Sequence, residues 1–210
     1  MRFTIVKGIL ENIVASMQPF LNKKDSSAIT SHVYLEIVNS QLIIRSTDYE
    51  MGCEAKTNDV SDIEDGNATV NGGNFLNIIR RLKDDEINIE VLQNNLMIKQ
   101  KRSNFKLPMY DANEYPSFPQ FENLKSINID TLNLINSIRK ITPSIDNNNP
   151  KFELNGALID IKMQKINFVA TDTRRLSVVT LENIANEETQ LIIPKKAIVE
   201  IQKLFLDEAV

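Results

Sequence analysis

The chain has 210 residues, of which 42% are hydrophobic and 25% are charged, and it carries a formal net charge of −4 with a pI of about 5.2. This composition is ordinary for a soluble globular protein, and the length is enough for two domains with a core each. No apolar run approaches transmembrane length. The single Cys53 excludes an internal disulfide and fits a reducing cytosol. One Cys with one His is too few for a structural zinc site.

The chain begins with an alternating strand, Phe3–Val6, and the charge at Arg2 argues against a signal peptide. A helix is predicted next, because apolar residues recur at helical spacing. These residues are Ile9, Leu10, Ile13, Val14, Met17, Phe20 and Leu21. A hairpin of Val33–Val38 and Leu42–Ser46 follows, turning at Asn39-Ser40.

A second helix is predicted at about Asn74–Leu82, entered through Gly72-Gly73. Three alternating strands and a proline-marked connector come after it. They are Ile87–Leu92, Leu96–Gln100, Ser103–Leu107 and the connector from Pro108 to about Gln120. We therefore predict an α+β unit that has one antiparallel sheet with two helices on one face.

The same pattern occurs twice. Residues Phe3–Asp48 match Ile127–Asp172 without a gap, at an offset of 124 positions. Matched positions include Leu10 with Leu134, Val14 with Ile138, Met17 with Ile141, Leu35 with Ile159, and Thr47-Asp48 with Thr171-Asp172. The stripe of the second helix recurs at offset 122 in Ala197, Ile198, Ile201 and Leu204. A period of this length is the size of a domain, so tandem domains are predicted at residues 1–120 and 121–210.

The second copy stops at Val210, just after its second helix. Roughly the last third of the repeat would then be missing, which would leave an open sheet edge and an exposed core. We therefore expect the chain to be a fragment of a longer protein, with an incomplete second domain.

Basic residues recur on or beside all four predicted helices, mostly away from the apolar stripes. They are Lys7, Lys23, Lys24, Arg80, Arg81, Lys83, Arg139, Lys140, Lys195, Lys196 and Lys203. Acidic residues gather elsewhere, at Asp59, Asp62, Glu64 and Asp65. An acidic protein can present a basic surface to nucleic acid in this way, although a solvated helix face is the commoner explanation for any single Lys or Arg.

Several stretches, in this order and spacing, resemble the bacterial DNA polymerase III β subunit family, the sliding clamps. They are Leu154–Leu158, Val169–Leu176 and Ile192–Lys196, supported by Thr47–Glu50, Leu107-Pro108 and Tyr115-Pro116. The resemblance spans essentially the whole chain. It implies the DNA clamp fold, with three such domains per chain, of which the third would be absent here.

The resemblance also implies a processivity factor. Two full-length chains would form a homodimer ring around duplex DNA, with helices lining the hole. The implied partners are the polymerase III alpha subunit, the clamp loader and other proteins that carry a clamp-binding motif, and the implied location is the cytoplasm, with no membrane association. Such a clamp has no catalytic residues, no cofactor and no metal, and it holds the polymerase on DNA by topology.

Residues of two binding surfaces are implied by matching positions. Lys24 and Asn148 match loops that touch DNA, and their expected neighbours are Lys23, Arg80, Lys195 and Lys196. The domain-two wall of a peptide-binding groove is matched by Leu154, Thr171, Thr173, Arg174, Arg175 and Leu176. The family commonly has Gly-His where this chain has Thr173-Arg174, which adds bulk and charge at the rim, so an altered peptide preference is expected.

Two other hypotheses are open at the sequence level. An enzyme could use Asp48 and Asp172 with the neighbouring arginines for acid–base chemistry, but a duplicated Thr-Asp after a strand is more typical of a hydrogen-bonded turn. The lone His32, expected on the wet side of its strand, lacks triad partners, and Gly72-Gly73 is too short for a phosphate loop. The second hypothesis is an interaction scaffold that never meets DNA.

Overall fold

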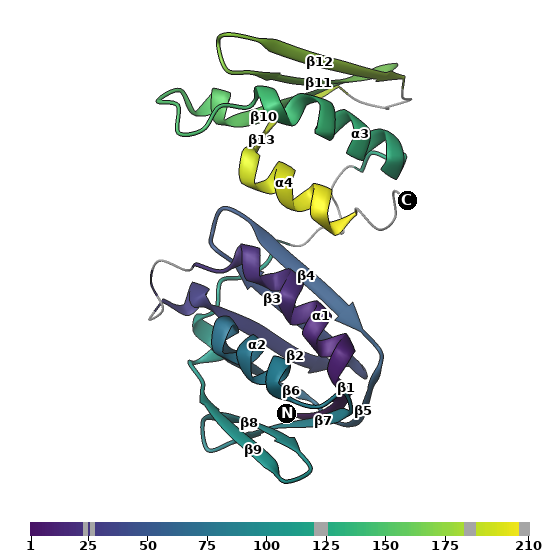
Figure 1. Ribbon diagram of the computed structural model, residues 1–210. Coiled ribbons are helices and arrows are strands. Elements are labelled where there is room, and N and C mark those ends of the chain that lie inside the picture. The colour runs from purple at the N-terminus through teal and green to yellow at the C-terminus, as the bar shows by residue number, and fades with distance from the viewer. Residues whose placement is uncertain (23–24, 26–27, 120–125, 183–187, 206–210) are drawn as a thin grey trace. The chain divides into compact units, whose positions relative to one another are not determined.

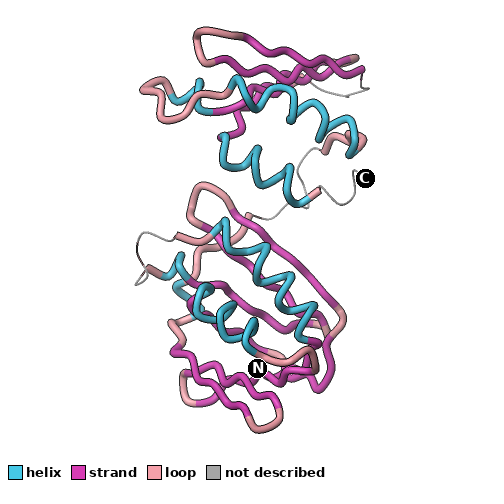
Figure 2. Tube along the Cα trace, in the orientation of Figure 1, coloured by secondary structure: helices cyan, strands magenta, loops and turns pink. Residues whose placement is uncertain are grey.

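The structure, a computed structural model, describes residues 1–22, 25, 28–119, 126–182 and 188–205. The chain divides into two compact units, Met1–Gln120 and Phe121–Val210, which we describe one at a time. Both units combine antiparallel strands with two long helices (Figures 1 and 2), which confirms the predicted α+β class.

The described residues of the first unit form nine strands and two long helices. In chain order they are β1 (Arg2–Val6), α1 (Lys7–Met17), β2 (His32–Val38), β3 (Gln41–Thr47), β4 (Gly52–Thr57), β5 (Val60–Glu64), β6 (Gly66–Asn71), α2 (Gly72–Arg81), β7 (Glu86–Leu92), β8 (Asn95–Gln100) and β9 (Ser103–Pro108). The strands form two sheets, ordered β5-β1-β7-β8-β9 and β4-β3-β2-β6, so the expectation of a single sheet is wrong for this unit.

Strands β4, β5 and β6 were not predicted, because their sequences are polar. The acidic residues that gather before α2 lie on and beside β5, an edge strand paired with β1. There Arg2 contacts Glu64 at 3.0 Å, and the Thr4 hydroxyl donates to Asp62 at 3.2 Å. An edge strand with a solvent-exposed face tolerates such charge. A pattern of alternating apolar residues is therefore weak in such a strand, and it predicts the strand poorly.

The core of the first unit is a single cluster between the helices and the strands. Leu10 and Val14 of α1 and Phe75 and Ile79 of α2 are fully buried against strand residues such as Leu35. Figure 1 shows both helices on the same side of the strands, as the sequence predicted. The apolar stripe therefore fixes which side of each helix faces solvent.

The connector after β9 packs on the first unit. Tyr110 stacks on the His32 ring with centroids 4.2 Å apart, and the Tyr115 hydroxyl donates to the carbonyls of His32 and Arg45. Phe118 lies against Gly52. His32 is therefore buried, at 3% exposure, and its expected place on the wet side of the strand is wrong. Burial lowers the pKa of His32 and raises that of Tyr115.

The second unit repeats the two long helices and the four-stranded sheet of the first unit. It contains α3 (Thr131–Ile141), β10 (Gly156–Lys162), β11 (Lys165–Thr171), β12 (Leu176–Glu182), β13 (Thr189–Pro194) and α4 (Lys195–Leu204). Its sheet is ordered β12-β11-β10-β13, which is the order of the four-stranded sheet of the first unit. Its core includes Ile138, Ile141, Phe168 and Ile198.

Two details of the repeat differ from the sequence alignment. First, α4 begins at Lys195 where α2 begins at Gly72, so the structural offset there is 123 rather than 122. Second, residues 126–130 form no strand, although Ile127 and Ile129 align with strand β1. In the first unit β1 is held by β5 and β7, and a strand without such partners leaves its backbone groups unpaired.

We expect Gly72→Ala to destabilise the first unit by about 1–3 kcal/mol, because the new Cβ would lie 2.4 Å from Leu21 and 3.1 Å from Val33. Gly73→Ala is the matched control, since its Cβ meets only Asn71 at 3.5 Å. The four tyrosines all lie in the first unit, so tyrosine fluorescence during urea unfolding reports that unit alone. Equal midpoints for the two variants would contradict the close packing.

Candidate functional site

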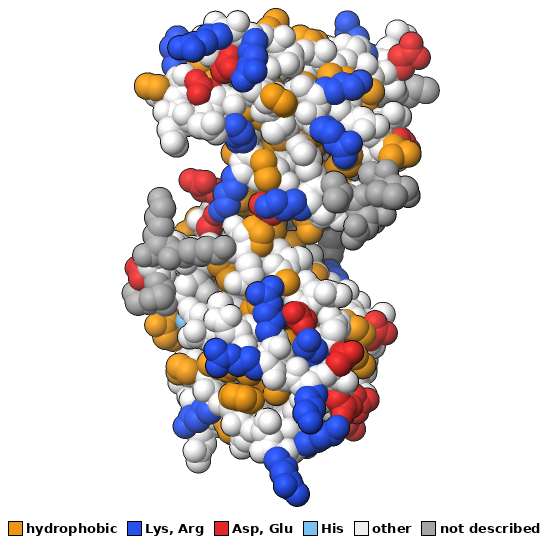
Figure 3. All heavy atoms as spheres, in the orientation of Figure 1, with side chains coloured by type: hydrophobic (Ala, Val, Ile, Leu, Met, Phe, Trp, Pro, Cys, Tyr) orange, Lys and Arg blue, Asp and Glu red, His pale blue; other side chains and the backbone are white. Residues whose placement is uncertain are grey.

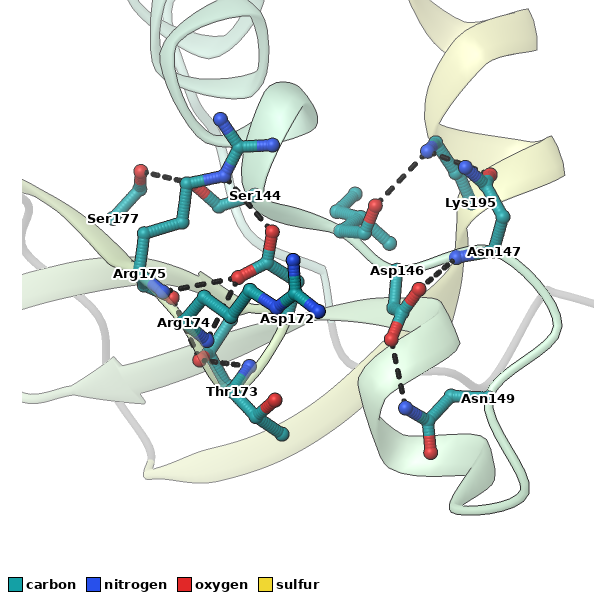
Figure 4. A network of polar contacts seen from close by, with 12 residues as sticks. Ser144, Asp146, Asn147, Asn149, Asp172, Thr173, Arg174, Arg175, Ser177 and Lys195 are labelled. Carbon is teal, nitrogen blue, oxygen red and sulfur yellow. Dashed lines mark hydrogen bonds and ion pairs between the residues drawn. The ribbon is translucent and has the colours of Figure 1, made fainter.

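The turn between β11 and β12 is held by the side chains of its first two residues (Figure 4). The Thr171 hydroxyl donates to the Arg175 carbonyl at 2.8 Å and accepts from the Thr173 amide at 3.2 Å. One oxygen of Asp172 accepts from the amides of Arg174 and Arg175, both at 3.0 Å, and the other accepts from the Arg175 guanidinium at 2.9 Å. The turn is thus fixed by its own polar side chains.

The first unit carries the same turn at the matching position. The Thr47 hydroxyl bonds the Met51 carbonyl at 2.8 Å, and Asp48 accepts from the amides of Glu50 and Met51 at 3.1 and 2.9 Å. The third residue has a positive φ in both turns, 72° at Tyr49 and 71° at Thr173. The prediction that the duplicated Thr-Asp builds a hydrogen-bonded turn is therefore confirmed.

These hydrogen bonds give the carboxylates of Asp48 and Asp172 a structural role in their turns, which needs no acid–base chemistry. Partial burial acts to raise the pKa of Asp172, but the amides of Arg174 and Arg175 and the Arg175 guanidinium outweigh it and hold that pKa below its usual range. A carboxylate held ionised by three hydrogen bonds is a poor proton donor at neutral pH. Asp48 and Asp172 moreover lie in different units.

The turn presents side chains to solvent. Leu176, the first residue of β12, is 65% exposed, and the Arg175 side chain is 62% exposed. Arg174 and Thr173 are exposed as well. Five of the six residues predicted for the peptide groove therefore share one short segment, which joins an apolar side chain to cationic ones.

Leu154, the sixth groove residue, lies in a short 3-10 helix, Phe152–Asn155, and is half-buried. Its carbonyl accepts from the Asp146 amide at 2.9 Å, which ties it to the loop after α3. That loop reaches the turn segment through a hydrogen bond of 2.6 Å between the hydroxyls of Ser144 and Ser177 (Figure 4). Leu154 and the turn thus belong to one connected network.

The loop that carries Asn148 is cross-linked on both sides of that residue. Lys195, at the start of α4, donates to the Ile145 carbonyl at 2.9 Å and to the Asn147 side chain at 2.8 Å. Asn149 donates to Asp146 at 2.7 Å and exchanges two hydrogen bonds with Asn155. Asn148 itself is exposed and has a φ of 59°.

The remaining DNA-contact candidates are placed on helices or fall outside the described residues. Lys23 and Lys24 belong to the second group. Arg80 lies in the last turn of α2, 3.4 Å from Glu11, which also contacts Lys7. Lys196 is exposed in the first turn of α4. Figure 3 shows Lys and Arg side chains spread over the helix-bearing face of the first unit, with acidic side chains among them and at its margins.

Sequence reasoning missed the residues that support the loop. Asp146, Asn155 and the Ser144–Ser177 pair carry no motif, because their partners are up to 33 positions away. A local signal was present in the run Asp146–Asn149, since Asp and Asn favour turns. Among the described residues, no helix is long and apolar enough to cross a membrane, and no group of three His, Cys, Asp or Glu side chains is placed to hold a metal ion.

Comparisons with known proteins agree on one family. The family model for the DNA polymerase III beta subunit, N-terminal domain, matches residues 1–119, and the model for its central domain matches residues 128–210. The beta sliding clamp of Helicobacter pylori strain ATCC 700392 / 26695 is 40% identical over 213 residues, covering 99% of this chain and 57% of that protein. The clamp of Vibrio cholerae is 27% identical over 206 residues, covering 97% and 56%.

Solved structures show the same fold. The Helicobacter pylori beta clamp bound to a DNA ligase peptide superposes with a TM-score of 0.90 at 39% identity, covering 98% of this chain and 59% of that one. The DNA polymerase III subunit beta of Pseudomonas aeruginosa gives 0.91 at 26% identity, covering 97% and 56%. The chain spans about 57% of the length of the curated relatives it matches.

Thr173→Gly should stabilise the second unit by up to about 1 kcal/mol. A β-branched residue at positive φ costs about 1–2 kcal/mol, whereas glycine gives back about 0.5–1 kcal/mol through the unfolded chain. Arg174→Gly is the control, because Arg174 is not among the residues with positive φ and should lose stability. Urea unfolding followed by circular dichroism compares them, and destabilisation of both variants would contradict strain at Thr173.

Proposed function

Because the chain belongs to the DNA polymerase III beta subunit family, we propose that its two units are the first two domains of a ring-shaped sliding clamp. In the complete protein two such chains form a homodimer around duplex DNA and hold the replicative polymerase there. The protein acts as a non-catalytic processivity factor in the bacterial cytoplasm. The observation that carries the proposal is the fixed turn at Thr171–Arg175, which presents Leu176 and two arginines to solvent.

The turn supports a role in peptide capture. An exposed leucine beside arginines offers an apolar anchor point with a polar rim, which is the usual anatomy of a peptide site. Leu154, Thr171 and Leu176 would contact the apolar residues of the peptide, and Thr173, Arg174 and Arg175 would line its rim. The proposed ligands are short motifs of the polymerase alpha subunit, the clamp loader and repair proteins, and a third domain supplies the opposite wall.

The exposed loop and helix cations support weak contacts with DNA. Asn148, Arg80 and Lys196 present polar or cationic groups at the surface, and Lys23 and Lys24 are proposed to act with them. Lys and Arg side chains that meet phosphates bind without reading sequence, which suits a protein that slides. The unrelated possibility, a scaffold that never meets DNA, predicts that these residues are dispensable for DNA retention.

Peptide capture is tested with a fluorescent peptide of the Gln-Leu-x-Leu-Phe type, titrated against the chain extended through a third clamp domain. We expect binding at roughly micromolar concentrations, weakened about tenfold or more by Arg175→Ala and lost in the 210-residue chain, because one groove wall is missing. Arg139→Ala, in the last turn of α3, is the control and should bind normally. No binding by the extended protein would sink the groove assignment.

DNA contact is tested by removing four cations together, with Lys23, Lys24, Arg80 and Arg81 each changed to Ala. We expect lower affinity for short duplex DNA and a shallower dependence on salt, by about 0.9 in the log–log slope for each phosphate that is no longer neutralised. The matched control removes four lysines that lie on strands, which are Lys56, Lys99, Lys106 and Lys165. Unchanged DNA affinity in the variant of Lys23, Lys24, Arg80 and Arg81 would favour the scaffold.

A further inference from the structure

Lys195 is committed to contacts inside its own unit. Its ammonium group donates to the Ile145 carbonyl at 2.9 Å and to the Asn147 side-chain oxygen at 2.8 Å (Figure 4). An ammonium group has three donors, so two of them are used here. The side chain is half-buried, whereas the neighbouring Lys196 is exposed.

These contacts act on the residues that flank Asn148. Lys195 holds Asn147 from the side of α4, and the Asn147 amide also donates to Asp146 at 2.6 Å. On the other side, Asn149 is held by Asn155 through hydrogen bonds of 2.7 and 2.8 Å. The exposed Asn148 therefore stands between two fixed neighbours, in a left-handed conformation with a φ of 59° that Asn tolerates better than most residues.

The lysine is a feature of the second unit alone. The structurally equivalent position in the first unit is Gly72, the first residue of α2, which has no side chain to reach a loop. Close packing of Leu21 and Val33 around Gly72 leaves no room for one. The two units thus share a helix start but use it differently, for tight packing in one and for a long-range anchor in the other.

We propose that Lys195 is a positioning residue, which holds the 145–149 loop so that Asn148 is ordered before DNA arrives. It does this instead of contacting phosphate itself. The inference rests on the proposed function, in which Asn148 meets DNA. A loop that is already ordered spares part of the ordering cost on binding, so the anchor adds affinity without adding a charge contact.

Hydrogen exchange tests the anchor without DNA. In Lys195→Met, the amides of Asn147 and Asn149 should exchange at least about tenfold faster than in the wild type, because local opening costs less. Exchange in β10 and β11 should be unchanged, which shows that the unit is folded. Lys196→Met is the control and should leave the loop unchanged. If Lys195→Met fails to fold, Asn147→Ala removes one of the two acceptors of Lys195 and leaves the Ile145 carbonyl. The Asn149 amide should still exchange faster in that variant, and equal exchange of this amide in Asn147→Ala and the wild type overturns the proposal.

Salt dependence of duplex binding, measured by fluorescence anisotropy, separates positioning from phosphate contact. Lys195→Met should weaken binding about as much as Asn148→Ala, the double variant should be no weaker than either single one, and the log–log salt slope should not change. Lys196→Met should lower that slope by about 0.9 if its ammonium group neutralises one phosphate.

The outcomes distinguish the inference from the function on which it rests. A slope reduced by about 0.9 in Lys195→Met would show that Lys195 itself meets a phosphate and overturn the inference. Weaker binding by Asn148→Ala together with normal binding by Lys195→Met would also overturn it, while the DNA function stands. Normal binding by all the variants, Lys196→Met included, would remove Asn148 and Lys196 from the DNA contact and overturn the inference with them.

Discussion

Burial of two helical stripes against strands is the constraint on which the rest of this chain depends. In the first unit Leu10, Val14, Phe75 and Ile79 have no exposed surface, and the second unit repeats the arrangement with Ile138, Ile141 and Ile198. Because the apolar faces of the helices are used for packing, partners meet the helices on their solvent faces. The cations in the last turns of α2 and α3 also lie where the helix dipole favours positive charge, so part of their recurrence has a structural cause.

The repeat keeps its backbone and changes its side chains. The turns Thr47–Met51 and Thr171–Arg175 share the hydrogen bonds between their Asp side chains and the backbone, and the same positive φ. The first presents Tyr49 and Glu50 where the second presents Thr173 and Arg174. In the first unit Phe118 of the connector lies on Gly52. The residue that matches Gly52 in the second unit is Leu176, which is exposed. A common fold therefore supports a closed surface in one unit and an open one in the other, and function is read from the side chains rather than from the fold.

The two proposed contact regions of the second unit share one polar network. The Ser144 hydroxyl is hydrogen-bonded to the Ser177 hydroxyl beside the turn. Hydrogen bonds from the Asn149 side chain and the Asn147 amide hold the pKa of Asp146 below its usual range. The negative charge of Asp172 lies near enough to oppose this effect. Both segments are thus ordered by internal hydrogen bonds, without help from a ligand. Ordered segments lose less entropy on binding, which suits contacts that must be weak yet reproducible.

The sequence by itself determined the period of the repeat, the helices, most strands and the turn at Thr171-Asp172, because these depend on local spacing: apolar residues at helical or alternating intervals, and Thr-Asp pairs that bond their own backbone. Tertiary structure decided what depends on distant partners. It divided the strands of the first unit into two sheets, formed edge strand β5 from an acidic sequence, buried His32 under Tyr110, and tied Lys195 to a loop about 50 positions away. Such contacts leave no periodic trace in the chain, because each joins residues that only the completed fold brings together.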